Sequence, residues 1–261
     1  MTMTFKDRLR QTGDRMTMHV CTIPSATVTQ ALAAAGADAV IVDLEHGATG
    51  YAEAQAMIAA TAGTRCAPTV RVARLEDADV KRALDIGAEG IVFPLVGTAE
   101  QAEWAVRSLR YPPEGTRSFG PFVAHSRYGQ DMMSYARTFA DRALTIILAE
   151  TVEAVENIEK IVKVPGIDLI IPAQFDLTTS MGIPGQFDHP DYVAALTRIE
   201  DAVRAAGIPL GGVALDAGQA QAAFGRGYRV IAGFDLLWLK ARAAQAQEWC
   251  GQGPCGRASA G

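Results

Sequence analysis

The chain has 261 residues and a formal net charge of −5; 49% of its residues are hydrophobic and 20% are charged. This length and apolar content support a large buried core, which excludes a disulfide-stapled miniprotein. The acidic balance, with no block of lysine and arginine, excludes nucleic acid and anionic membrane surfaces as partners, because both are bound through clustered positive charge.

Residues 1–15 carry charges throughout and lack the apolar core of a signal peptide. No stretch of the sequence approaches the roughly 18 apolar residues that a membrane-spanning helix needs. We therefore expect a cytoplasmic protein with no membrane partner.

Eight segments rich in β-branched residues alternate with alanine-rich helical patterns. The predicted strands are 17–22, 39–44, 67–72, 90–95, 144–149, 167–172, 208–213 and 229–233. The predicted helices are 26–35, 51–62, 77–86, 99–109, 151–162, 190–206, 217–225 and 235–247. Uninterrupted β-branched runs are typical of parallel strands covered on both faces. Eight alternations predict an α/β protein with a single-domain (β/α)8 TIM barrel over 1–250, and the small polar residues 251–261 predict a disordered tail.

An open nucleotide-binding sheet is the main alternative fold, and the sequence argues against it. Such a sheet shows a glycine-rich phosphate fingerprint after its first strand, whereas Ile-Pro-Ser-Ala follows strand 17–22 here. Residues 111–141 form a longer segment with a short helix near 129–140. We expect this segment to cover the active site.

Polar residues gather at the carboxyl ends of the predicted strands, where the loops of a barrel form its open mouth. Glu150 follows the fifth strand and Asp176 follows the sixth. Two carboxylates that converge in a partly buried mouth repel each other unless a proton or cation lies between them. Because no cysteine or histidine cluster accompanies them, Mg²⁺ or Mn²⁺ suits the pair better than Zn²⁺. We favour a metal site over the alternative, in which each acid caps the helix or turn that follows it.

Arg71 and His46 lie near the same mouth, and Asp85 is a further, less clear candidate. Arg71 ends the third strand, and its planar fork fits a 2-oxo acid or a carboxylate, with a salt bridge to Asp43 or Glu45 as the alternative. His46 follows Asp43 in a turn, where the carboxylate can orient the imidazole, so this histidine is the best candidate for a general base. Asp85 ends the third helix, where packing is the default interpretation.

The positions of the lysines argue against a Schiff-base aldolase. Such enzymes need a lysine inside the barrel, usually on a strand. The lysines of this chain, at 6, 81, 160, 163 and 240, all fall in predicted helices or at their ends. A metal must therefore replace the imine as the electron sink.

In this order and spacing, the residues resemble the metal-dependent (class II) pyruvate aldolases, the family of 4-hydroxy-2-oxoheptanedioate aldolase and 2-keto-3-deoxy-L-rhamnonate aldolase. The similarity covers 5–245 and rests on the segments 43–46, 70–72, 87–94, 111–117, 150–154 and 176–182. The resemblance implies an aldolase that cleaves or forms 4-hydroxy-2-oxo acids. It implies that Glu150 and Asp176 bind a divalent metal ion (Mg, Mn or Co) and that Arg71 holds the pyruvate oxygen.

The resemblance also implies that His46 with Asp43 serves the acid/base step and that Asp85 supports this histidine. The chain departs from the family before the second metal ligand, where Ala-Gln-Phe-Asp replaces the usual Gly-Pro-Ala-Asp. The new side chains, Gln174 and Phe175, change the mouth beside the metal. We expect both to contact the substrate and to alter the preference for the aldehyde.

The family resemblance implies a homo-oligomer, either a trimer or a hexamer built as a dimer of trimers, with the last helix exchanged between subunits. Ordinary packing of that helix on the barrel is the alternative.

The implied partners are small molecules, a 2-oxo acid and an aldehyde. The aldehyde pocket would come from a neighbouring subunit or from the segment 111–141, where Phe119, Phe122, His125 and Arg127 are candidates; loop packing is the alternative for all four.

Two other functions stay open. An oxaloacetate decarboxylase or a citrate-lyase-like CoA-thioester lyase keeps the enolate and changes the bond that breaks, although a CoA enzyme should show a basic rim that this acidic chain does not obviously offer. A non-catalytic barrel that only binds a 2-oxo acid has no need for Asp43 and His46.

Overall fold

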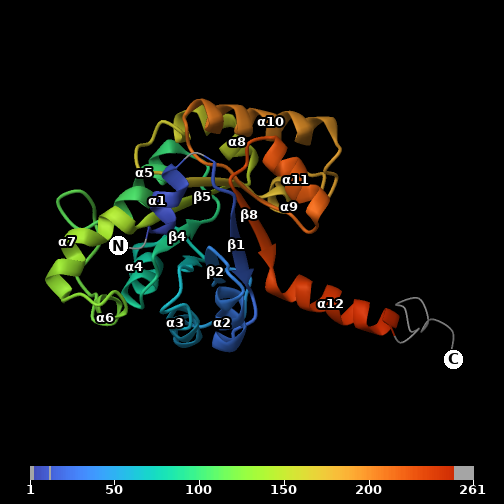
Figure 1. The fold of residues 1–261 in the computed structure, drawn as a ribbon. Coiled ribbons are helices and arrows are strands. Elements are labelled where there is room, and N and C mark those ends of the chain that lie inside the picture. The colour runs from blue at the N-terminus through green and yellow to red at the C-terminus, as the bar shows by residue number, and fades with distance from the viewer. Residues whose placement is uncertain (1–2, 12, 250–261) are drawn as a thin grey trace.

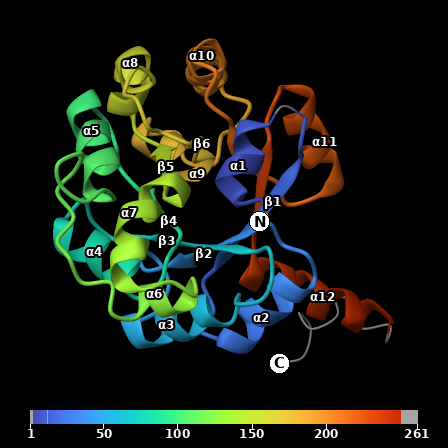
Figure 2. The same cartoon turned by 60° about the vertical axis from the view of Figure 1, so that its left-hand side comes forward.

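The structure is a computed structural model that describes residues 3–11 and 13–249 and shows a barrel of eight parallel strands (Figures 1 and 2). The strands are β1 Met16–Cys21, β2 Ala39–Asp43, β3 Ala67–Arg71, β4 Gly90–Phe93, β5 Leu144–Ala149, β6 Leu169–Pro172, β7 Gly211–Val213 and β8 Val230–Phe234. They pair in the order β6-β5-β4-β3-β2-β1-β8-β7, and an isolated bridge from Ile170 to Leu210 brings the seventh strand beside the sixth. The barrel is nearly closed, which confirms the predicted (β/α)8 fold. The predicted tail, 251–261, lies outside the described residues.

Helices occupy the connections between strands and surround the barrel (Figure 2). They are α1 Phe5–Arg10, α2 Ala26–Ala34, α3 Tyr51–Ala59, α4 Asp77–Asp85, α5 Ala99–Ser108, α6 Ala124–Arg127, α7 Met132–Arg142, α8 Val152–Ile161, α9 Gln174–Ser180, α10 Pro190–Ala205, α11 Ala217–Gly225 and α12 Asp235–Trp249. Every predicted helix is present, with ends shifted by a few residues. The short helices α1, α6 and α9 are additions that the apolar periodicity did not predict.

Two strands begin at least two residues later than predicted. The sixth starts at Leu169 rather than 167, and the seventh starts at Gly211 rather than 208. Pro209 has no N–H group to contribute to a strand ladder, which explains the later start of β7. At two helix-to-strand turns, Gly36 and Gly87 take φ values of 97° and 109°, the left-handed conformation that closes a helix.

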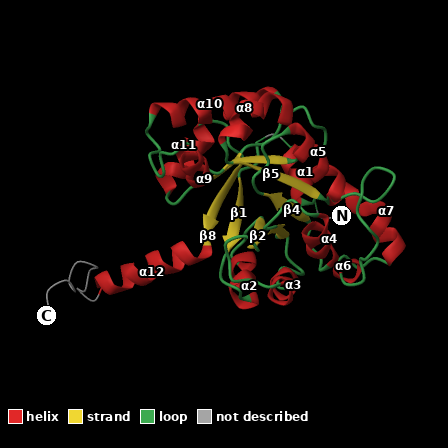
Figure 3. Cartoon of the chain, turned by 180° about the vertical axis from the view of Figure 1, so that it is seen from behind, coloured by secondary structure: helices red, strands yellow, loops and turns green. Residues whose placement is uncertain are grey.

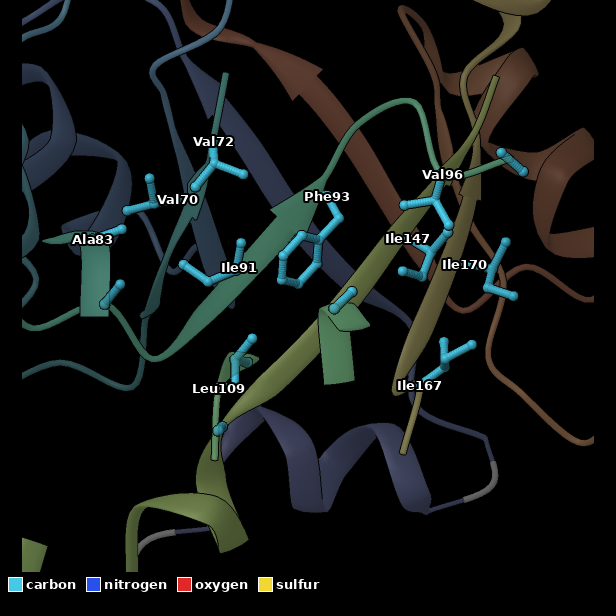
Figure 4. Packing of buried hydrophobic residues seen from close by; sticks show 14 of the residues in the cluster. Val70, Val72, Ala83, Ile91, Phe93, Val96, Leu109, Ile147, Ile167 and Ile170 are labelled. Carbon is cyan, nitrogen blue, oxygen red and sulfur yellow. The ribbon is translucent and has the colours of Figure 1, made fainter. Parts of the chain in front are cut away.

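The apolar core has two layers because successive strand residues point to opposite faces of the sheet. Ile146 belongs to a cluster with Met18 and Ile41 that is made only of strand residues and of side chains from α1, so it fills the barrel interior. Its neighbour Ile147 belongs to a larger cluster, with Ile91, between the sheet and the helices (Figure 4). The charged side chains of these strands, Asp43 and Arg71, both lie at strand ends.

Helix α1 closes the amino-terminal end of the barrel. Phe5 and Leu9 pack into the interior cluster, and the Lys6 ammonium donates to the carbonyl of Ala143 at 2.5 Å. The same ammonium lies 3.1 Å from Asp168 Oδ2, and both side chains are buried. Burial lowers the pKa of Lys6 despite this partner. The end of the barrel opposite the mouth is thus sealed by this helix.

We expect Leu9→Ala to lower the free energy of unfolding by about 2 to 3 kcal/mol, because it leaves a cavity among buried interior side chains. Urea denaturation followed by circular dichroism measures this change. The control is Met3→Ala at an exposed side chain, which should cost less than about 0.5 kcal/mol. Equal effects of the two substitutions would show that α1 contributes nothing to the core.

Helix α12 extends away from the barrel (Figures 1 and 3). Only its start is anchored, where Trp238 lies edge-on to His19 of β1, with 4.7 Å between the ring centroids. Leu236, Leu237 and Leu239 are left exposed. Ordinary packing along the barrel is therefore not observed. Among the described residues, no helix is both long and apolar enough to cross a membrane.

Candidate active site

A buried ion-pair network joins the ends of β2 and β3, which pair in register at Asp43 and Arg71. The guanidinium donates from Nε to Asp43 Oδ1 at 2.8 Å and from Nη2 to Oδ2 at 2.7 Å. Its third nitrogen, Nη1, lies 3.2 Å from Glu45 Oε2. Burial favours the neutral form of Asp43, but Arg71 outweighs it and holds the pKa of this carboxyl below its usual value. The salt-bridge alternative for Arg71 is thus observed, with both acids.

Asp43 does not orient the imidazole of His46 as expected. Its Oδ1 instead accepts from the backbone N–H groups of Glu45 at 3.0 Å and of His46 at 3.4 Å. These contacts fix the turn after β2, so the acid shapes the loop that carries the histidine. The imidazole is 62% exposed at the mouth, and its Nε2 lies 3.8 Å from Glu45 Oε2.

Glu150 is buried at the end of β5. Its Oε1 accepts from the backbone N–H of Leu95 at 2.6 Å. Burial raises the pKa of Glu150 to about 7; the amide opposes this shift, and the charges of Asp176 and Glu45 add to it. The carboxylate therefore lies where a negative charge is costly and no cationic side chain pairs with it directly among the described residues.

Capping explains neither of the two acids that were predicted as metal ligands. Helix α8 is capped by Thr151, whose hydroxyl accepts from the N–H of Ala154 at 3.0 Å, so Glu150 is not its cap. The N-cap of α9 is Ala173, without a side-chain hydrogen bond, and Asp176 lies in the first turn of that helix. The capping alternative is therefore wrong for both.

The acids at the mouth fit a hard divalent cation. Glu150, Asp176 and Glu45 influence one another's charge across the mouth, which disfavours three bare carboxylates without a cation. No group of three or more candidate ligands is gathered within the described part of the chain. A cation here would be coordinated by few protein oxygens and would complete its coordination shell with oxygens of water and substrate, as Mg²⁺ does.

A cavity of about 70 Å³ opens between the strand ends. Arg71 and Asp176 line it, together with Gln174 and Phe175 from the first turn of α9. The predicted substrate contacts, Arg71, Gln174 and Phe175, therefore line one small cavity with the predicted metal ligand Asp176.

Asp85 and two of the loop candidates serve the packing of segment 111–141. Asp85 Oδ1 accepts from the buried Arg117 at 2.7 Å, and no contact joins it to His46 in the part of the chain that the structure describes. His125 Nδ1 lies 2.8 Å from the carbonyl of Gln130. Arg127 donates to the carbonyl of Ile58 at 2.7 Å.

The remaining loop candidates, Phe119 and Phe122, are exposed. Phe119 rests on Tyr111, with 6.0 Å between ring centroids. Neither ring lines the mouth cavity. Segment 111–141 thus presents these two rings as exposed apolar surface rather than as a wall of that cavity.

Sequence reasoning did not identify Leu95 or Glu45 as site residues. Leu95 follows β4 with φ 56°, a conformation that is strained for a leucine and that clusters at functional sites. Its contribution is a backbone N–H, which no residue type reveals. Glu45 was visible in the sequence only as a possible partner of Arg71.

The fold and this site define a class of protein. The model of the HpcH/HpaI aldolase/citrate lyase family matches residues 17–240. The chain belongs to this family, and the predicted fold and carbon–carbon lyase class are confirmed.

Named relatives agree with this assignment. The hydroxypyruvate/pyruvate aldolase of Paraburkholderia phytofirmans is 33% identical over 92% of this chain and 95% of that protein. The 2-keto-3-deoxy-L-rhamnonate aldolase of Salmonella gallinarum is 30% identical over 89% of this chain and 87% of its own length. The crystal structure of a family protein from Burkholderia cenocepacia J2315 superposes with a TM-score of 0.88 at 30% identity, covering 94% of this chain and 98% of that one.

Proposed function

We propose that the protein is a metal-dependent aldolase that cleaves or forms 4-hydroxy-2-oxo acids, with pyruvate or a related 2-oxo acid and an aldehyde as the other reactants. The observation that carries this proposal is the Glu150 carboxylate, which is buried at the end of β5, caps no helix and is influenced by the charge of Asp176. A buried acid of this kind is costly to stability, and a bound cation removes the cost.

Glu150 and Asp176 would hold the ion, which supplies Lewis-acid stabilisation of the enolate when bound. Mg²⁺, Mn²⁺ and Co²⁺ are the proposed ions.

Arg71 supplies a second positive charge at the mouth, in addition to the metal ion. Its guanidinium is held on two sides by Asp43 and Glu45, so it presents a fixed donor to the oxygens of a 2-oxo acid, and these hydrogen bonds strengthen as negative charge builds on the substrate.

His46 is the proposed proton acceptor in cleavage. The imidazole takes the proton of the 4-hydroxyl, the C3–C4 bond breaks, and its electron pair stays on the 2-oxo acid as the enolate while the aldehyde leaves. Protonation at C3 then completes the 2-oxo acid product. The Glu45 carboxylate lies beside this imidazole, with Oε2 3.8 Å from Nε2.

We expect His46→Ala to lower kcat for aldol cleavage by about 10²- to 10⁴-fold, the usual contribution of a general base. Pyruvate release from a 4-hydroxy-2-oxo acid measures this loss, and calorimetric titration with Mn²⁺ should show nearly unchanged affinity. His189→Ala, at the start of α10, is the matched control. Equal loss of activity and of metal affinity would make His46 a ligand instead of a base.

A homo-oligomer, a trimer or hexamer, is part of the proposal. The exposed leucines of α12 and its extension from the barrel support exchange of this helix between subunits (Figure 1). Light scattering on the full chain and on a chain that ends before Asp235 tests it, since loss of α12 should lower the oligomer mass. A cytoplasmic location stays a prediction.

A further inference from the structure

Two cavities adjoin at Gln174 and Phe175. One is the mouth cavity; the other, of about 320 Å³, is lined by residues of α9, α10 and α11 and of the end of β7. Figure 1 labels these three helices. Gln174, Phe175 and Val213 line both. We call the second cavity the side pocket; its apolar wall is formed by Phe175, Phe187, Tyr192, Leu196 and Leu215.

The two cavities differ in volume and therefore suit ligands of different size. The mouth cavity, at about 70 Å³, equals roughly two to three liquid water molecules at about 30 Å³ each. It therefore suits a small 2-oxo acid and has no room for a bulky aldehyde tail. The side pocket is about 320 Å³, and an apolar cavity of about 150 Å³ already admits benzene.

The wall of the side pocket is suited to an aromatic group. Phe175 and Phe187 meet edge to face, with centroids 5.2 Å apart and an interplanar angle of 87°. Phe187 meets Tyr192 in the same way at 6.0 Å. Phe175 is still 45% exposed, so one further ring can extend this series with the geometry that aromatic pairs prefer.

The charge of the side pocket favours an uncharged occupant. Its cationic lining residue is Arg226, and the Nε of this arginine lies 3.4 Å from Glu200 Oε1. Glu200 also accepts from the hydroxyl of Tyr228 at 2.8 Å. Because the arginine is paired, the pocket offers no uncompensated positive charge to an anionic tail.

We propose that the side pocket is the acceptor subsite and binds the apolar, preferably aromatic, tail of the aldehyde. Phe175 and Gln174 then lie between that tail and the reacting carbonyl. This inference rests on the proposed function, because it names the substrate class of the same site.

The test compares two aldehydes that differ only by a phenyl group in place of a methyl group, phenylacetaldehyde and propanal, each with pyruvate. The readout is the ratio of their kcat/KM values for aldol addition, and the wild-type enzyme should favour phenylacetaldehyde. Leu215→Trp and Ala222→Phe fill the pocket from the loop after β7 and from α11, and both positions are exposed. Each should lower the ratio at least about tenfold.

Val193→Trp is the control, since this exposed residue of α10 does not line the pocket, and its ratio should equal that of the wild type. The inference is overturned if the wild type prefers propanal, or if both filling variants keep the wild-type ratio while the enzyme remains an aldolase. Wild-type enzyme that neither adds pyruvate to any aldehyde nor exchanges the C3 protons of pyruvate with solvent would instead overturn the proposed function, and this inference with it.

Discussion

Replacing Glu150 by glutamine is expected to lower kcat/KM for pyruvate release by about 10³-fold. A bound metal ion contributes several kcal/mol to stabilising the developing charge, which corresponds to a loss of this size. Glutamine keeps the size of the side chain and an oxygen that can accept from the Leu95 amide, so the fold should persist. The measurement is steady-state kinetics at a fixed Mn²⁺ concentration, together with Mn²⁺ affinity by calorimetry.

Glu153→Gln is the matched control for this substitution. Glu153 is exposed in the first turn of α8, three residues further along the chain, and its loss should leave both kinetics and metal affinity near wild type. Wild-type activity in Glu150→Gln would contradict the metal assignment. Unchanged Mn²⁺ affinity in that variant would do the same.

Arg71→Ala is expected to lower the free energy of unfolding by about 3 to 5 kcal/mol and to abolish activity. The substitution leaves Asp43, which has no exposed surface, as an uncompensated buried charge, and breaking a buried ion pair from one side has a cost of this size. Urea denaturation monitored by circular dichroism measures the stability change. The double variant Asp43→Asn with Arg71→Met should recover a large part of the stability and none of the activity.

Arg74→Ala provides the comparison, because Arg74 is 62% exposed and pairs with Glu76 and Asp79 near the surface. Exposed pairs of this kind contribute about 0 to 1 kcal/mol. Should the two arginine substitutions prove equally costly, the interpretation of Arg71 as the partner of a buried carboxylate would be wrong.

The barrel and the positions of its acids were predictable because they follow from local patterns. Buried parallel strands are recognised from continuous β-branched runs, and their carboxyl ends meet at one mouth. These patterns therefore predict that Glu150 and Asp176 lie at the same edge of the barrel. The geometry removes the capping alternative, since Thr151 caps α8.

The connections within the site were less predictable, because they depend on backbone geometry. The Asp43 carboxylate accepts hydrogen bonds from Arg71 and from backbone amides rather than from the His46 ring. The spacing of these residues in the sequence is compatible with either arrangement. The Leu95 amide carries no side-chain signature. Helix α9 has seven residues, too few to show an apolar period, although its first turn places Gln174 and Phe175 at the mouth.

The central claim, enolate chemistry at a metal held by Glu150 and Asp176, is tested most directly by metal removal. Pyruvate release from a 4-hydroxy-2-oxo acid should fall to background after exhaustive chelation of the protein and return on addition of Mn²⁺, Mg²⁺ or Co²⁺. Full activity in rigorously metal-free protein, with substrate trapped on a lysine by borohydride, would contradict the account.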